Sequence, residues 1–176
     1  MKGELFMFGL ENYNPKMYTN PSNIIKDHRN ALEELIGKNI EEIWVAWEQD
    51  EDEWFNDCPV VIRFENCQLE LCANKADEYV VTFNKILVTQ DLCWYGTDLR
   101  LKWEKNKLQD LNSATGKRVV GIEILERCET NETDYFYLYG IGLHLNDGYL
   151  AICNGFDENS LIIKREEGPI YRHTLI

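Results

Sequence analysis

Two short segments of the sequence carry the same oxygen-bearing side chains at the same spacing, Asn-x-x-Asp-Glu. Together they comprise Asn74, Asp77, Glu78, Asn154, Asp157 and Glu158. Carboxylates beside an amide can bind calcium or act as general acid and base. Neither segment has the alternating oxygens and turn glycine of a helix-loop-helix calcium site, whereas Asn and Asp often fix a turn by accepting backbone N–H bonds. We therefore predict two structural turns without metal or cofactor, and keep a ligand-binding or acid–base site as the alternative.

His144 is the second candidate for chemistry. It lies among small side chains, and Cys153 is predicted on the same face of a hairpin. A Cys and a His on one face could act as a nucleophile and its base. The predicted register, however, places Ala151 rather than Cys153 opposite His144, and the sequence shows no third orienting group and no oxyanion site. We therefore predict no catalytic residue, and a shallow groove near His144 belongs to the alternative site.

The most acidic stretch of the chain is WEQDEDEWFNDC at residues 47–58, where carboxylates surround two aromatic rings. Such a run is commonly a solvated loop whose aromatic residues lie in the core. It can also form a binding patch, in which aromatic anchors ringed by acid attract and hold a basic partner. The predicted partner-binding residues are Asp50, Glu51, Asp52, Glu53, Trp54 and Phe55.

The balance of charge limits the kinds of partner. Lys and Arg total 18 and Asp and Glu total 31, so the net charge is -13. Nucleic-acid backbones and anionic lipids would repel such a chain, and we predict neither a nucleic-acid nor a membrane partner. A basic protein would be attracted.

The first residues and the cysteines indicate the compartment. The apolar run from Leu5 to Leu10 is too short for a signal peptide or a membrane span. Six cysteines without a C-x-x-C spacing indicate reduced thiols rather than disulfides or a zinc site. We therefore predict a cytoplasmic protein.

The sequence aligns with itself over most of its length. Gly37-Lys38 matches Gly116-Lys117, the apolar positions that follow stay in register, and both copies end in the Asn-x-x-Asp-Glu segment. The copies span about 22–84 and 104–164, after an N-terminal extension at 1–21. We predict one domain over 1–176, α+β but β-dominated, in which two tandem copies of a helix/strand/β-hairpin unit form one or two antiparallel sheets.

Periodicity places the elements of each copy. A helix is predicted over 22–36, with Ser22 or Asn23 as its N-cap and Gly37 as its left-handed end, and a shorter helical turn is predicted near 108–116. Alternating apolar residues predict hairpins that turn at Asn66-Cys67 and Asp147-Gly148, with Arg63 opposite Glu70. Further strands are predicted at 42–48, 79–84, 98–103, 118–126, 135–140 and 160–164, with an edge strand near 4–8.

The hairpins and the segments that follow them, RFENCQLELCANKADE and HLNDGYLAICNGFDEN, resemble small, acidic, uncharacterised proteins of Gram-positive bacteria. Some proteins of that size and character are grouped with immunity proteins that neutralise polymorphic toxins. This resemblance implies a non-enzymatic, cytosolic protein that masks a basic partner. The alternative is a small enzyme or ligand-binding protein that uses the groove near His144 or the paired Asp-Glu loops.

Overall fold

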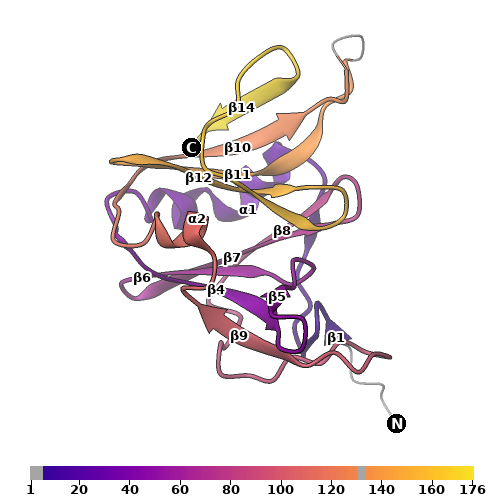
Figure 1. Ribbon diagram of the computed structural model, residues 1–176. Helices are drawn as coiled ribbons and strands as arrows, with labels where there is room; N and C mark the ends of the chain where they lie inside the picture. The colour runs from indigo at the N-terminus through magenta and orange to yellow at the C-terminus, as the bar shows by residue number, and fades with distance from the viewer. Residues whose placement is uncertain (1–5, 131–133) are drawn as a thin grey trace.

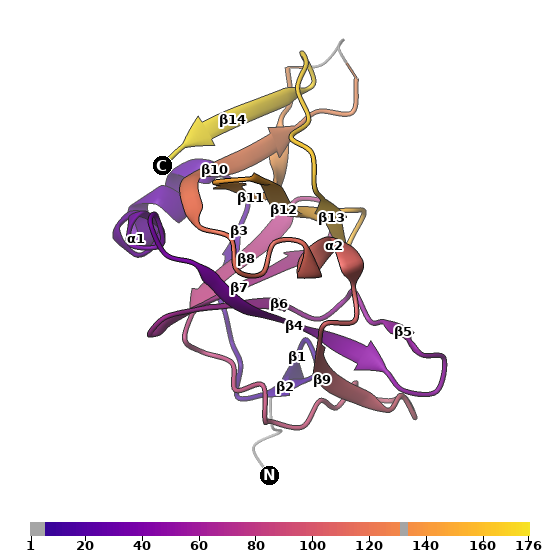
Figure 2. The same cartoon turned by 60° about the vertical axis from the view of Figure 1, so that its left-hand side comes forward.

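The computed structural model describes residues 6–130 and 134–176, which form two antiparallel sheets that pack face to face (Figures 1 and 2). The first sheet has the order β3 (Met17–Tyr18), β8 (Glu78–Phe83), β7 (Cys67–Asn74), β6 (Val60–Phe64), β4 (Ile40–Glu48) and β5 (Glu53–Trp54), with β9 (Leu101–Lys105) also paired to β4. The second sheet has the order β13 (Asn159–Ile162), β12 (Gly148–Asn154), β11 (Tyr137–Leu145), β10 (Val119–Arg127) and β14 (Tyr171–Leu175). The β-dominated, antiparallel architecture that the alternation predicts is confirmed.

The main core lies between the sheets. Alternate residues of β6 and β7 on one side, and of β10, β11 and β12 on the other, form one buried apolar cluster, to which α1 (Pro21–Glu33) and α2 (Gln109–Asn112) contribute. A second cluster covers the other face of the first sheet with residues from 8–17 and 86–103. This region includes the small sheet of β1 (Phe6–Met7) and β2 (Leu10–Glu11), where an edge strand was predicted at 4–8; residues 4 and 5 lie outside the described residues.

The first helix begins earlier than the sequence predicts. Its N-cap is Asn20 rather than Ser22 or Asn23, because the Asn20 side chain accepts a hydrogen bond from the Asn23 N–H and Pro21 occupies the first helical turn. Proline is favoured there, since that N–H would have no helical partner. The regular helix ends at Glu33, and the chain turns on to Gly37, whose φ of +92° is the predicted left-handed conformation.

Both hairpins turn one residue earlier than predicted, at 65–66 and 146–147. Phe64 pairs with Cys67 and Leu145 with Gly148, so Arg63 faces Gln68 instead of Glu70. Moving the turn by one residue changes each strand partner by two residues, so every apolar side chain stays on the same face of the sheet. Alternation alone therefore cannot distinguish the observed register from the predicted one. The same change places Tyr149, not Ala151, opposite His144.

Two strands of the second sheet also differ from the prediction. The strand predicted at 135–140 is the first part of the longer β11. The edge strand β14 was not predicted, because its sequence YRHTL has no apolar alternation and both of its faces are partly exposed.

The aligned Gly-Lys segments meet where the two halves of the chain join. Four backbone hydrogen bonds connect them: Gly37 N–H to Val119 C=O, Gly116 N–H to Ile40 C=O, Ile40 N–H to Lys117 C=O, and Val119 N–H to Lys38 C=O. When Gly37 is matched with Gly116, each of these bonds maps onto another of the four. The junction therefore has a local two-fold symmetry.

Buried polar groups connect the sheets at the opposite end of the core. The Asn159 side chain is 1% exposed, accepts a hydrogen bond from the Ala73 N–H at 2.8 Å, and donates to the carbonyls of Asn56 and Cys58 at 2.9 and 2.7 Å. The Tyr79 hydroxyl donates to the Ile152 carbonyl at 2.6 Å. Asn159, the first residue of β13, thus connects the second sheet to β7 and to the segment that leads into β6.

We predict that Asn159→Ala lowers the free energy of unfolding by about 3 kcal/mol, because the buried Ala73 N–H and Cys58 C=O lose their partner. Urea denaturation followed by tryptophan fluorescence measures this change. The control is Asn112→Ala on the exposed end of α2, which should change the stability by less than about 0.5 kcal/mol. Equal effects of the two substitutions would contradict the role given to Asn159.

Candidate functional site

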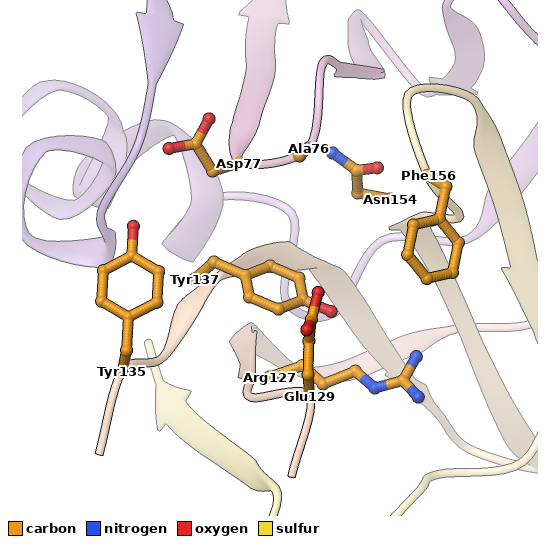
Figure 3. A pocket seen from close by; sticks show the side chains of 8 residues that line it. All are labelled: Ala76, Asp77, Arg127, Glu129, Tyr135, Tyr137, Asn154 and Phe156. Atoms are coloured by element: carbon orange, nitrogen blue, oxygen red, sulfur yellow. The ribbon is translucent and has the colours of Figure 1, made fainter. Parts of the chain in front are cut away.

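A pocket of about 490 Å³ opens where the two Asn-x-x-Asp-Glu loops lie beside the ends of β10 and β11 (Figure 3). We call it the loop pocket. Its lining residues are Ala76, Asp77, Arg127, Glu129, Tyr135, Tyr137, Asn154 and Phe156. Its size lies in the range of small-ligand sites.

Asn154 brings the two loops together. Its side chain is buried, and its Nδ2 donates to the Lys75 carbonyl at 2.5 Å and to the Glu78 carbonyl at 3.4 Å. Its Oδ1 accepts the Asp157 N–H at 3.0 Å, which is the turn-forming bond expected of an Asn at a strand end. One side chain therefore shapes its own loop and holds the loop of the other half.

Phe156 is the most unusual residue of the pocket. Its side chain is 78% exposed, and its φ of +67° is followed by +73° at Asp157. Successive left-handed residues other than glycine are uncommon and costly. The backbone bond from the Gly155 N–H to the Glu158 carbonyl, at 2.8 Å, helps to hold this conformation. The fold thus holds the Phe156 backbone in the turn and leaves its ring in solvent.

Aromatic rings line the pocket from both sides. Tyr135, which is 69% exposed, stands on the side opposite Phe156, and Tyr137 lies between them (Figure 3). Asp77 and Glu129 add carboxylates to this lining. The arrangement offers flat apolar surfaces and negative charge to one ligand.

Arg127 is the cation among the lining residues, and it is already held by the protein. Its guanidinium carbon lies 5.4 Å from the ring centre of Tyr139 and 5.7 Å from that of Tyr171. In Figure 3 the guanidinium points to the Phe156 side, away from Asp77 and Tyr135. None of the labelled residues therefore places a cation in the half of the pocket between Asp77 and Tyr135.

More negative charge lies behind the Phe156 loop. Burial raises the pKa of Asp57, and the nearby charges of Glu158 and Asp157 raise it further. Burial is the larger cause, and the smaller contributions show that the Asp157 and Glu158 carboxylates lie near Asp57. The surroundings of the loop pocket therefore favour positively charged ligands.

The aromatic residues predicted as partner anchors in the acidic stretch are half-buried, and their role as anchors stays a prediction. Trp54 pairs with Trp47 of β4 and packs against the main core, whereas the Phe55 ring packs against Trp94 with 4.9 Å between ring centres. They are placed there because β5 folds back onto β4, a pairing that the sequence does not reveal.

The carboxylates of this stretch divide into two groups. Asp50 forms an ion pair with Arg100, and Asp52 accepts a hydrogen bond from the Trp47 indole at 2.8 Å. Glu51 and Glu53 are exposed at the tip. Their predicted role in attracting a partner remains a prediction.

His144 belongs to a cluster on the outer face of the second sheet, centred on the fully buried Glu123. The Glu123 carboxylate accepts hydrogen bonds from the Tyr149 hydroxyl at 2.9 Å and from the Arg165 Nε at 3.0 Å. His144 Nε2 and His173 Nδ1 each lie 3.2 Å from its oxygens. Sequence reasoning missed Glu123; the signal for it is a carboxylate between Ile122 and Ile124 in the strand VVGIEILER.

The Glu123 cluster has the character of a structural ion pair. Arg165 occupies both carboxylate oxygens, and no group of His, Cys, Asp or Glu among the described residues has metal-binding geometry. Cys153 pairs with Gly140 rather than with His144, and burial raises the pKa of its thiol. The thiol is therefore protonated at neutral pH, which does not suit a nucleophile.

No protein-family model, no curated protein and no solved structure matches this chain. Within the described part of the chain, no helix is long and apolar enough to cross a membrane.

We predict that Glu123→Gln destabilises the protein by roughly 3 kcal/mol at neutral pH, because a buried pair loses its charge. Burial alone would raise the pKa of the Glu123 carboxyl above its ordinary 4.5. Hydrogen bonds from Arg165, Tyr149 and His144 have the larger effect together, and the pKa is lowered to about 2. The ionised carboxylate therefore adds stability above pH 4.5 that is lost as the pH falls to 2.

Urea denaturation at several pH values measures this effect. The difference between the wild type and Glu123→Gln should shrink as the pH falls from 4.5 to 2. Glu167→Gln is the matched control, because Glu167 binds the same Arg165 with a side chain that is 72% exposed. A difference that stays constant with pH would show that Glu123 is not ionised in the folded protein.

Proposed function

We propose that this protein is a non-enzymatic, cytoplasmic binding protein that masks a basic protein partner, as the immunity proteins that its hairpins resemble do. The observation that carries this proposal is Phe156, an aromatic ring held out in solvent at positive φ beside a pocket with carboxylates. We place the partner's main contact at the loop pocket.

The fixed position of Phe156 supports a binding role. An exposed ring contributes little to the stability of the free protein, and covering it with another apolar surface removes apolar area from water and favours binding. Aromatic residues supply much of the binding energy at interfaces, and an anchor held rigid before binding loses less entropy. Asn154 and the turn that it forms provide this rigidity.

Charge supports a basic partner. The net charge of -13 attracts cationic proteins over long distances, and Asp57, Asp157 and Glu158 concentrate negative charge beside the anchor. Glu51 and Glu53 would add to this attraction from the acidic stretch. In this arrangement the acidic stretch speeds association, and the loop pocket holds the partner.

We further propose that the halves 22–84 and 104–164 are copies of one unit. The reciprocal hydrogen bonds at the Gly-Lys junction and the identical displacement of the two turns support this interpretation. In the alignment Ala76 corresponds to Phe156, and both line the loop pocket. The pocket would then have formed between equivalent loops, of which one acquired the aromatic anchor.

We predict that Phe156→Ala weakens binding of the partner at least tenfold, which corresponds to about 1.4 kcal/mol, mainly through faster dissociation. The free energy of unfolding of the Phe156→Ala variant should stay at the wild-type value, because the ring that it lacks is exposed in the wild type. The partner is first captured from a lysate of the source cell, and surface plasmon resonance then compares the variants. The control is Tyr95→Ala, which removes a ring that is 88% exposed in the connection between β8 and β9. If Phe156→Ala binds like the wild type, the loop pocket is not the contact.

We also predict that the double substitution Glu51→Gln and Glu53→Gln slows association a few-fold at low salt and leaves dissociation unchanged, because exposed charges act at long range. Asp50 and Asp52 are left in place, since their contacts with Arg100 and Trp47 are structural. Stopped-flow measurements over a range of salt concentrations test this prediction. An unchanged association rate at every salt concentration would exclude the acidic stretch from partner attraction.

A further inference from the structure

The two ends of the loop pocket have different chemistry. Arg127 lies on the Phe156 side with its guanidinium against Tyr139 and Tyr171, and its Nε is buried without a hydrogen-bond partner among the described residues. At the other end stand Asp77 and the exposed ring of Tyr135, with Glu129 between the ends (Figure 3). A ligand at that end meets the Asp77 carboxylate and an aromatic face, and the Glu129 carboxylate lies toward the middle of the pocket.

We infer that the loop pocket binds an arginine side chain of the partner, which stacks against Tyr135 and pairs with Asp77 and Glu129. This inference rests on the proposed function, since it names the group through which a basic partner enters the pocket. Phe156 and Tyr137 cover the aliphatic part of the side chain and its backbone. The volume of about 490 Å³ has room for both.

Arginine suits this lining better than lysine. The planar guanidinium stacks on aromatic rings and can also donate paired hydrogen bonds to a carboxylate. The lysine ammonium is more strongly hydrated and does not stack. Since Asp77 and Glu129 enter from different segments of the chain, a group with donors in several directions can reach both.

An anionic ligand suits the same lining poorly. It would face Asp77 and Glu129 directly, and the carboxylates of Asp157 and Glu158 belong to the loop that carries Phe156. Arg127 does not offset this charge at the Tyr135 end, because it points away from it.

The test is an NMR titration of the full-length, isotope-labelled protein with four blocked amino acids. They are the N-acetyl amides of arginine, lysine, citrulline and glutamate, and citrulline is the neutral counterpart of arginine with nearly the same shape. The arginine compound should shift the backbone signals of 76–77, 135–137 and 154–157, with a dissociation constant on the order of a millimolar. Citrulline should bind at least tenfold more weakly, and lysine several-fold more weakly.

Substitutions assign the binding to the pocket. Asp77→Asn should weaken binding of the arginine compound about tenfold, as expected for loss of one charged hydrogen-bond partner. The matched control Asp98→Asn, on an exposed position before β9, should leave it unchanged. Backbone signals away from the loop should stay in place in both variants, which shows that they are folded.

Three results would overturn the inference: citrulline or glutamate binds as tightly as arginine, the shifts fall outside the loop pocket, or Asp77→Asn has no effect. If the arginine compound fails to bind but Phe156→Ala still weakens the partner complex, the loop pocket binds the partner through a group other than arginine. If the arginine compound binds but Phe156→Ala does not affect the partner, the pocket is an arginine site and the partner-binding proposal falls.

Discussion

The contact on which the rest of this structure depends is the pair of buried amides, Asn154 and Asn159, between the two sheets. Apolar side chains bring the sheets together, but apolar contact is not directional and would allow the sheets to slide. Asn159 instead bonds to backbone groups of Ala73, Asn56 and Cys58, whose positions allow one alignment. A buried amide without such partners is costly, so other alignments are disfavoured.

This constraint also places the loop pocket. Asn154 and Asn159 lie at the two ends of the loop that carries Phe156, and each binds backbone of the first half. The loop is therefore fixed at both ends while its middle faces solvent. The four bonds of the Gly-Lys junction fix the halves at a second point, so the aromatic and acidic walls of the pocket keep their separation.

Local patterns in the sequence predict local structure well. Alternation identifies both hairpins, and Gly37 marks the end of the first helical segment. The same alternation leaves the register open by two residues, since Leu69 and Leu71 face the core in either pairing.

Features that need long-range pairing could not be predicted. The burial of Trp54 depends on β5 folding onto β4, and the role of Glu123 depends on Arg165 and His173, which reach it from a strand connection and an unpredicted edge strand. The Asn-x-x-Asp-Glu segments are intermediate: their types and spacing predict turns, but not that the turns meet. Only the fold shows that Asp77 and Phe156 line one pocket.

Hydrogen–deuterium exchange of the complex with the captured partner shows whether the loop pocket is the contact, because it maps the protected backbone without a substitution. We predict that binding slows exchange at 75–78, 135–137 and 154–158, the backbone around the loop pocket. Protection confined to β14 and the Glu123 cluster, with the loops exchanging as in the free protein, would contradict it.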